Sequence, residues 1–316
     1  MNNRRSFIVG LKSTEISSKE QLFLKKYKPW GVILFTRNIK NLNQTKKLTS
    51  KIRNIFNDKK YPIMIDQEGG RVSRLENIIS FKNLTSDFFG KKYVKNKKDF
   101  DIYFKIFIDK TSYLLKELGI NINSVPVLDL KISGSSKIIG DRSFSRDPNI
   151  VSKIGDICIQ TYKENSIGTI IKHIPGHGLA KVDSHFSTPY INKSLQYLLK
   201  NDFKAFKNKN SFFAMTAHIL YKKLDKKNCV THSKKIINEI IRKKIGFKGL
   251  LISDDISMKA LKFDIITNAK KSLKAGCNLV LYCSGNSKVS TKLLKNIPLI
   301  DKFTQKKTSQ FYKFLG

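Results

Sequence analysis

The stretch GLLISD, residues 249–254, is a nearly continuous apolar run that ends in an acidic residue, Asp254. A continuous apolar run of this length indicates a strand buried on both faces, as in a parallel sheet. Seven further runs of this kind occur at residues 6–10, 31–35, 62–66, 121–126, 169–173, 212–218 and 278–282. The sequence therefore predicts eight strands of one parallel sheet.

Longer segments with helical spacing and charged faces lie between these runs. They cover residues 19–27, 42–56, 98–118, 151–165, 194–208, 233–244, 265–275 and 288–296. Eight strands alternating with about eight helices form the pattern of an α/β fold, the (β/α)8 TIM barrel. An open doubly wound sheet is the competing fold, but the first run lacks its glycine-rich phosphate turn. Because no linker or low-complexity segment interrupts the pattern, we expect a single TIM-barrel domain over residues 1–316.

Charged and polar residues stand where the predicted strands end. The third run ends at Asp66, the fifth at Lys172 and His173, the sixth at His218 and the seventh at Asp254. In a TIM barrel, the C-terminal strand ends and the loops after them form one active-site face. Charge at a buried strand end is costly unless a partner or ligand compensates it, so we expect these side chains around one pocket.

Two connections exceed the ~2–6 residues usual between a strand and a helix. They cover residues 128–149 and 174–190. Both follow strands, so both are predicted to belong to the active-site face.

Three of the five histidines, His173, His177 and His185, fall within thirteen residues. One interpretation is a metal site in which Asp183 supplies an oxygen ligand. The other is a loop that transfers protons and binds substrate, because imidazole titrates near neutral pH. The spacing H-x3-H-x7-H is not a standard metal-ligand pattern, so we favour proton transfer and expect neither a metal nor a cofactor.

The chain is strongly basic, with 61 Lys and Arg against 24 Asp and Glu and a formal net charge of +37. Clustered cations would indicate nucleic-acid binding. The lysines are instead spread along the chain, and no arginine-rich arm accompanies them. We therefore expect no specific nucleic-acid partner and only weak adhesion to polyanions.

The sequence predicts neither export nor a disulfide framework. The four cysteines form no CxxC pair, and the apolar run at residues 7–11 is too short for a signal peptide. No apolar run approaches the ~20 residues needed to span a bilayer. We expect a cytoplasmic monomer without membrane insertion.

Five motifs resemble the family 3 glycoside hydrolases. They are DQEGGRVSR (66–74), GDRSFSRDP (140–148), KHIPGHG (172–178), VDSHFSTP (182–189) and SDDISM (253–258). Within that family they are similar to the bacterial β-N-acetylglucosaminidases, or β-hexosaminidases, of peptidoglycan recycling. The motifs keep the family's order, with Ile174 where relatives often carry Phe. The flanking strands extend the resemblance over most of the chain.

The resemblance implies a role for each matching residue. Asp254 would be the nucleophile, His185 the general acid and base, and Asp183 the residue that orients His185. The side chains that would hold the sugar hydroxyls and the N-acetyl group are Asp66, Arg74, Arg142, Lys172 and His173. The family further implies a retaining mechanism through a covalent glycosyl–Asp intermediate. Its substrate would be a fragment of the GlcNAc-anhydromuropeptide type, from which terminal GlcNAc is released.

The residue types are compatible with these roles. A carboxylate held at a strand end suits attack on an oxocarbenium-like centre. Most glycosidases employ a second carboxyl group as the acid and base, whereas the VDSH segment offers a histidine beside an aspartate.

Other interpretations remain. A GlcNAc phosphorylase would use the same intermediate with phosphate as acceptor, a β-glucosidase would not require the N-acetyl group, and a basic polyanion-binding protein would need no catalysis. Arg74 and Arg142 could pair with Asp66 or Asp141 instead of contacting substrate, although the motif match favours substrate contact.

Four nearby residues have structural interpretations. We expect Asp255 to cap the helix after the seventh strand and Met258 to pack in the core. His177 could bond the loop backbone without touching substrate, and His218 suits a site wall and a buried structural role equally.

Overall fold

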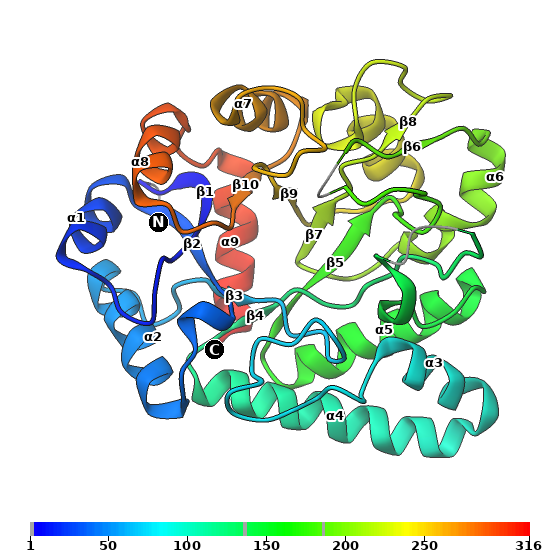
Figure 1. Cartoon of the computed structure of the whole chain (residues 1–316), viewed down its shortest axis with the longest axis horizontal. Helices are drawn as coiled ribbons and strands as arrows, with labels where there is room; N and C mark the ends of the chain where they lie inside the picture. Colours follow the sequence, from blue (N-terminus) through cyan, green and yellow to red (C-terminus); the bar gives the residue numbers. More distant parts are fainter. Residues whose placement is uncertain (1–2, 135–137, 185–186) are drawn as a thin grey trace.

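The computed structural model describes residues 3–134, 138–184 and 187–316. Within them, eight parallel strands close into a barrel in the order β1-β10-β9-β7-β5-β4-β3-β2 (Figure 1). They are β1 (Arg5–Gly10), β2 (Pro29–Leu34), β3 (Ile63–Ile65), β4 (Ile122–Asn123), β5 (Gly168–Ile174), β7 (Phe213–Thr216), β9 (Leu250–Asp255) and β10 (Leu279–Tyr282). Each strand overlaps one of the eight predicted runs, which confirms the (β/α)8 barrel.

Helices surround the barrel, and most lie where helical spacing predicted them. They are α1 (Ser18–Tyr27), α2 (Leu42–Phe56), α3 (Ser86–Lys95), α4 (Lys97–Glu117), α5 (Pro148–Glu164), α6 (Leu195–Lys200), α7 (Ile265–Ala275), α8 (Ser287–Asn296) and α9 (Lys302–Phe314), together with a π-helical segment at Ile236–Lys244. Their buried faces pack on the outside of the strands in a large apolar layer. The predicted helix over 194–208 is interrupted at Asn201, where α6 gives way to a 3-10 helix, Asp202–Phe206.

Side chains fill the barrel interior, and α9 closes its N-terminal end. Trp30 at the start of β2 donates a hydrogen bond from Nε1 to Thr308 Oγ1 at 2.9 Å. The rings of Phe213, at the start of β7, and Phe311 are 5.1 Å apart. Figure 1 shows α9 passing behind the strands. The end of the barrel that remains for a site is therefore the C-terminal one.

Two helices were not predicted from the sequence. α3 carries Gly90, which disfavours a helix by about 1 kcal/mol relative to alanine. A Cβ on Gly90 would lie 1.6 Å from Phe144 O, so close packing explains the glycine. α9 buries Thr304 and Thr308 beside Phe311, so its buried face lacks the aliphatic periodicity that identifies a helix.

Short strands tie the long loop 174–190 to its neighbour. β6 (Tyr190–Ile191) pairs in parallel with β8 (Leu220–Tyr221), which follows β7. The C-terminal end of the loop is therefore anchored beside the barrel mouth.

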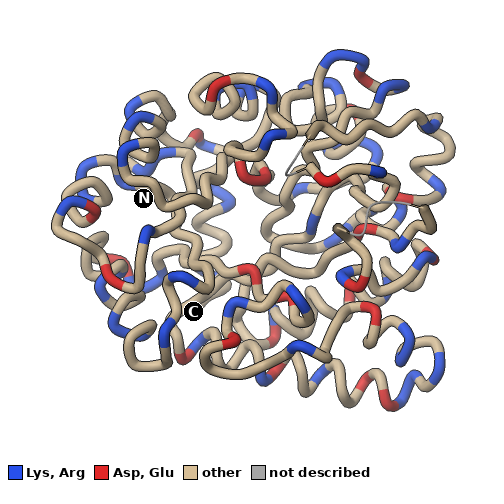
Figure 2. Tube along the Cα trace, in the orientation of Figure 1, with Lys and Arg blue, Asp and Glu red and all other residues tan. Residues whose placement is uncertain are grey.

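The charge is distributed over the whole molecule. Figure 2 shows Lys and Arg along the entire trace, interspersed with fewer Asp and Glu. In the described part of the chain, none of the helices has the length and apolar character that a membrane crossing requires.

Candidate active site

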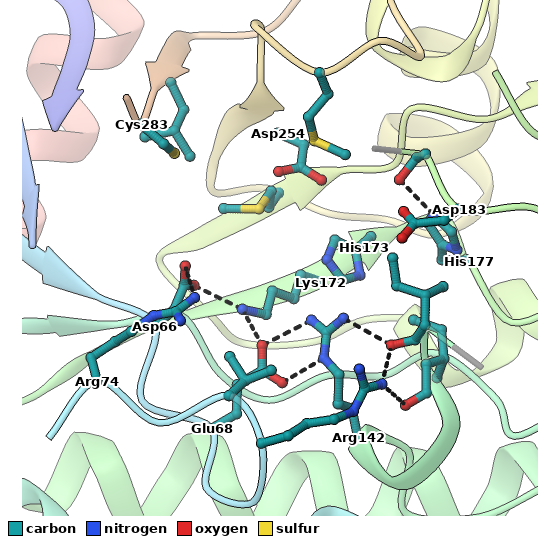
Figure 3. A pocket seen from close by; sticks show the side chains of 18 residues that line it. Asp66, Glu68, Arg74, Arg142, Lys172, His173, His177, Asp183, Asp254 and Cys283 are labelled. Atoms are coloured by element: carbon teal, nitrogen blue, oxygen red, sulfur yellow. Dashed lines mark hydrogen bonds and ion pairs between the residues drawn. The ribbon is translucent and has the colours of Figure 1, made fainter. Parts of the chain in front are cut away.

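A cavity of about 510 Å³ opens at the C-terminal ends of the strands (Figure 3). It is lined by seven of the eight residues singled out from the sequence: Asp66, Arg74, Arg142, Lys172, His173, Asp183 and Asp254. The eighth, His185, lies outside the described residues. The barrel thus brings into one pocket residues from 66 to 254 that are far apart in the sequence.

A buried ion-pair network forms one wall of the cavity. Lys172, on β5, lies with Nζ 2.9 Å from Asp66 Oδ1 and 2.6 Å from Glu68 Oε1. It also donates to Ser124 Oγ at 3.1 Å. Arg142 contacts Glu68 through two hydrogen bonds, Nε to Oε2 at 2.8 Å and Nη2 to Oε1 at 2.9 Å. Glu68 therefore links a lysine from β5 to an arginine from the loop 128–149.

The network keeps its groups charged. Burial opposes ionisation of Asp66, yet the Lys172 and Arg74 charges outweigh it and lower the pKa of Asp66. Burial acts against Glu68 in the same way, and Arg142 and Lys172 hold its pKa well below the usual range. Burial would lower the pKa of Lys172, but the two carboxylates raise it. The wall presents ionised donors and acceptors, which suits binding of hydroxyl groups.

The two arginines both pair with carboxylates and still line the cavity. Arg74 Nη2 lies 3.8 Å from Asp66 Oδ2. Arg142 pairs with Glu68 rather than with Asp141, which lies 2.8 Å from Arg71 Nε. The sequence left open whether these arginines pair with carboxylates or contact substrate. In the structure they pair with carboxylates and also line the cavity.

Asp254 stands near the end of β9 and lines the cavity. Its Oδ1 accepts a hydrogen bond from Asp255 N at 2.8 Å. Burial would raise the pKa of Asp254, but His218 and His173, the Asp255 N–H and Lys172 lower it. The carboxylate is therefore held in its ionised form, as a nucleophile requires.

His173 follows Lys172 on β5 and is held by Asp129. Its Nδ1 lies 2.6 Å from Asp129 Oδ2. Asp129 Oδ1 also accepts from His177 N at 2.6 Å, at the start of the long loop. One buried carboxylate thus fixes both the ring at the strand end and the first turn of the loop.

The loop 174–190 brings further groups to the cavity. His177, Asp183 and Ser184 line it, and His177 Nε2 lies 3.2 Å from Ser184 Oγ. Burial and the nearby His173 lower the pKa of His177 to about 4, so its ring is neutral at pH 7. Figure 3 shows His173, His177 and Asp183 at the same side of the pocket.

Three structural expectations have different outcomes. Asp255 does not cap a helix, because α7 begins ten residues later and is capped by Asp264. Its Oδ1 accepts from Ser257 N at 3.0 Å and so closes a turn. Met258 is buried as expected, but it also lines the cavity. His218 is fully buried, with Nδ1 2.7 Å from Thr231 Oγ1.

Sequence reasoning did not identify Glu68 or Asp129 as site residues. Glu68 stands inside the quoted motif DQEGGRVSR, two residues after Asp66, and could have been found there. Asp129 is the acid in the apolar stretch VPVLDL (125–130), three residues after the end of the fourth predicted strand. An acid among apolar residues at a strand end was the available signal.

Among residues 3–134, 138–184 and 187–316, no three His, Cys, Asp or Glu side chains are grouped so as to hold a metal ion.

Sequence comparison places these residues in a known family. The model of the glycosyl hydrolase family 3 N-terminal domain matches residues 8–308. A β-hexosaminidase from Hydrogenovibrio crunogenus is 34% identical over 283 residues, which cover 88% of this chain and 78% of that protein. A β-hexosaminidase from Haemophilus influenzae is 32% identical over 304 residues, or 94% of this chain and 84% of that protein.

Solved structures give the same result. NagZ from Neisseria gonorrhoeae superposes with a TM-score of 0.85 at 28% identity, covering 99% of this chain and 90% of that one. The same protein has been solved in complex with N-trifluoroacetyl-D-glucosamine. A family 3 β-N-acetylglucosaminidase from Paenibacillus sp. str. FPU-7 shares the fold with a TM-score of 0.84 at 24% identity, and 98% of this chain spans 60% of its length. The chain therefore belongs to glycosyl hydrolase family 3 and is a glycoside hydrolase.

Proposed function

We propose that the protein is a retaining exo-β-N-acetylglucosaminidase that removes terminal GlcNAc, with Asp254 as its nucleophile. The observation that carries the proposal is the ionised Asp254 carboxylate in a cavity whose far wall is the Asp66–Lys172–Glu68 network. Such a cavity offers a nucleophile on one side and a set of charged groups for sugar hydroxyls on the other (Figure 3).

The reaction proceeds in two displacements. A carboxylate oxygen of Asp254 forms a bond to the anomeric carbon while the bond from that carbon to the leaving oxygen breaks. His185 gives its proton to the leaving oxygen, and Asp183 orients and polarises His185. Water then attacks the anomeric carbon, His185 takes the proton from this water, and Asp254 is released as a carboxylate. No cofactor takes part.

The sugar is held by the wall opposite the nucleophile. Asp66 accepts hydrogen bonds from hydroxyl groups, and Lys172, Arg74 and Arg142 donate to oxygens of the sugar and its N-acetyl group. Asp66 is already paired with Lys172 and Arg74, and Arg142 is paired with Glu68, so these groups are fixed before the substrate arrives. Fixed polar groups avoid reorganisation during the reaction.

The substrate class is a small cell-wall fragment of the GlcNAc-anhydromuropeptide type. The relatives named β-hexosaminidase and the N-trifluoroacetyl-D-glucosamine complex of a structural neighbour support an N-acetylated sugar at the cleaved end. We infer that the enzyme acts as a cytoplasmic monomer with one catalytic domain.

Trapping of the intermediate tests the nucleophile. A C5-fluorinated N-acetylglucosaminyl fluoride slows both displacements, while its fluoride leaving group allows the first to proceed. We expect peptide mapping by mass spectrometry to find the sugar on Asp254 in the wild type and on no peptide of Asp254→Asn. A sugar on another residue, or turnover without any trapped species, would refute the mechanism.

Inorganic phosphate separates hydrolysis from phosphorolysis. With phosphate added, we expect free GlcNAc as the product and an unchanged rate. A GlcNAc phosphate product would instead establish a phosphorylase that uses the same intermediate.

A further inference from the structure

Asp129 is a buried acid that contacts two residues of the cavity wall, His173 and His177. It follows β4, and its side chain is 0% exposed. Its neighbours His173 and His177 both line the cavity. A buried carboxylate needs hydrogen-bond donors, and Asp129 receives all of those described here from this pair.

Both carboxylate oxygens are occupied in a defined way. Oδ2 lies 2.6 Å from His173 Nδ1, and Oδ1 accepts from His177 N at 2.6 Å. The backbone N–H of His173 lies between them, 3.3 Å from Oδ1 and 3.2 Å from Oδ2. The ring nitrogen of His173 and the backbone N–H groups of His173 and His177 thus all contact this one carboxylate.

The charge state of Asp129 fixes the proton on His173. Burial would raise the pKa of Asp129, but the two histidines and their hydrogen bonds lower it, so the group is a carboxylate. An ionised carboxylate only accepts hydrogen bonds, so His173 Nδ1 must carry the proton. The hydrogen bond from Nδ1 to Asp129 thus sets which ring nitrogen carries the proton. The other ring nitrogen, Nε2, remains for the substrate.

We propose that Asp129 is a positioning residue of the sugar site, which fixes His173 with Nδ1 protonated and Nε2 directed at the substrate. In the neutral ring, Nε2 accepts a hydrogen bond from a sugar hydroxyl, while the adjacent Lys172 donates one. The donor and the acceptor stand side by side on β5. This role rests on the proposed function, since it assigns the bound group as a sugar.

Asp129→Asn is the informative substitution because it has the same shape. The amide oxygen of Asn can still accept from the two backbone N–H groups, so the start of the loop is retained. The amide NH2 then faces His173 Nδ1 and donates to it, so the ring proton moves to Nε2. The neutral ring of the variant would then present a donor at Nε2, where the neutral ring of the wild type presents an acceptor.

The tautomer is measured without turnover, by long-range ¹H–¹⁵N NMR of protein labelled with ¹⁵N-histidine. His173→Gln identifies the His173 signals among the five histidines. We expect Nδ1 to be protonated in the wild type and unprotonated in Asp129→Asn. An unprotonated Nδ1 in the wild type, or the same tautomer in both proteins, would overturn the proposal.

Kinetics tests whether Asp129 acts through His173. We expect Asp129→Asn to lower kcat/KM about ten- to hundredfold, by analogy with the range found for groups that orient metal-bound histidines. In a His173→Gln background, the same substitution should cost less than about threefold, because coupled residues are not additive. Losses that multiply would show an independent structural effect and overturn the proposal.

Asp58→Asn is the matched control, a partly buried carboxylate at the opposite end of the barrel. Asp58 accepts from Tyr312 Oη at 2.6 Å and pairs with Arg4. We expect this variant to have a lower Tm with unchanged kcat/KM and unchanged histidine signals. If the wild type turns over no N-acetylglucosaminide but shows the expected tautomers, the proposed function fails and the Asp129–His173 assignment stands. If turnover is observed with the opposite tautomer, only the assignment fails.

Discussion

Glu68 Oε1 and Lys172 Nζ lie 2.6 Å apart, and both side chains are 3% exposed. Arg142 adds two hydrogen bonds to the same carboxylate. Removing one partner of such a buried group leaves uncompensated charge, which costs about 3–5 kcal/mol. We therefore expect Glu68→Gln to lower the free energy of unfolding by that amount, measured by urea denaturation.

An exposed pair provides the control for this prediction. Glu117 lies close to Lys46 with both side chains more than 40% exposed. Exposed pairs contribute about 0–1 kcal/mol, so Glu117→Gln should change the free energy of unfolding little. Equal effects of the two substitutions would show that the buried network does not stabilise the protein.

Two helical glycines differ in what a side chain would meet. A Cβ on Gly90 would lie 1.6 Å from the backbone oxygen of Phe144, whereas one on Gly155 would lie 2.5 Å from Leu128 Cδ2. A backbone atom cannot move aside as the end of a leucine side chain can. We expect Gly90→Ala to destabilise the protein by about 1–3 kcal/mol, and Gly155→Ala to be less harmful. Thermal unfolding of both variants measures these effects. A Gly90→Ala protein more stable than the wild type would contradict the packing of α3 on the loop 128–149.

Asp202 makes stability depend on pH. Neither of its carboxyl oxygens has a hydrogen-bond partner among the described residues. Burial and nearby Asp129 raise the pKa of Asp202 to about 7, from an ordinary value of 3.8. The folded state holds this proton more tightly than the unfolded state, so stability is lost as the pH rises between these values.

We therefore expect the Tm of the wild type to fall between pH 4 and pH 7 more than that of Asp202→Asn. The amide carries no charge, so at pH 8 the variant should have a Tm at least about 2 °C higher. An identical dependence on pH in both proteins would mean that Asp202 is not the group responsible.

The dispersed positive charge predicts a particular response to salt. Binding to double-stranded DNA should be detectable at low ionic strength, should be independent of sequence, and should disappear near 0.15 M salt. Fluorescence anisotropy with two unrelated duplexes measures this. A duplex that is bound preferentially at physiological salt would favour a specific nucleic-acid partner.

The barrel strands could be predicted because each is buried on both faces. Runs such as IVG in β1 and LLIS in β9 have an apolar character that does not depend on distant residues. Helix α9 could not be found in this way, because its buried positions Thr304 and Thr308 are polar. Burial of Thr308 is explained by the hydrogen bond that it accepts from Trp30, far away in the sequence.

The site residues likewise fall into those that the sequence predicted and those that it did not. Asp66, Lys172 and Asp254 end predicted strands, so topology alone gathers them. Asp129 was missed because its local signal, an acid among apolar residues, does not identify its partner His173, which is 44 positions away. The roles of the catalytic residues remain predictions, including that of His185, which lies outside the described residues.

Hydrolysis of a chromogenic β-N-acetylglucosaminide tests the central claim most directly. The proteins to compare are the wild type, Asp254→Asn, and Asp264→Asn, in which an exposed helix cap is replaced by another good cap. We predict turnover by the wild type and Asp264→Asn, and a loss of at least about 10³-fold in kcat for Asp254→Asn. Comparable turnover by all three proteins, or none by folded wild type, would contradict the assignment of Asp254 as the nucleophile of an N-acetylglucosaminidase.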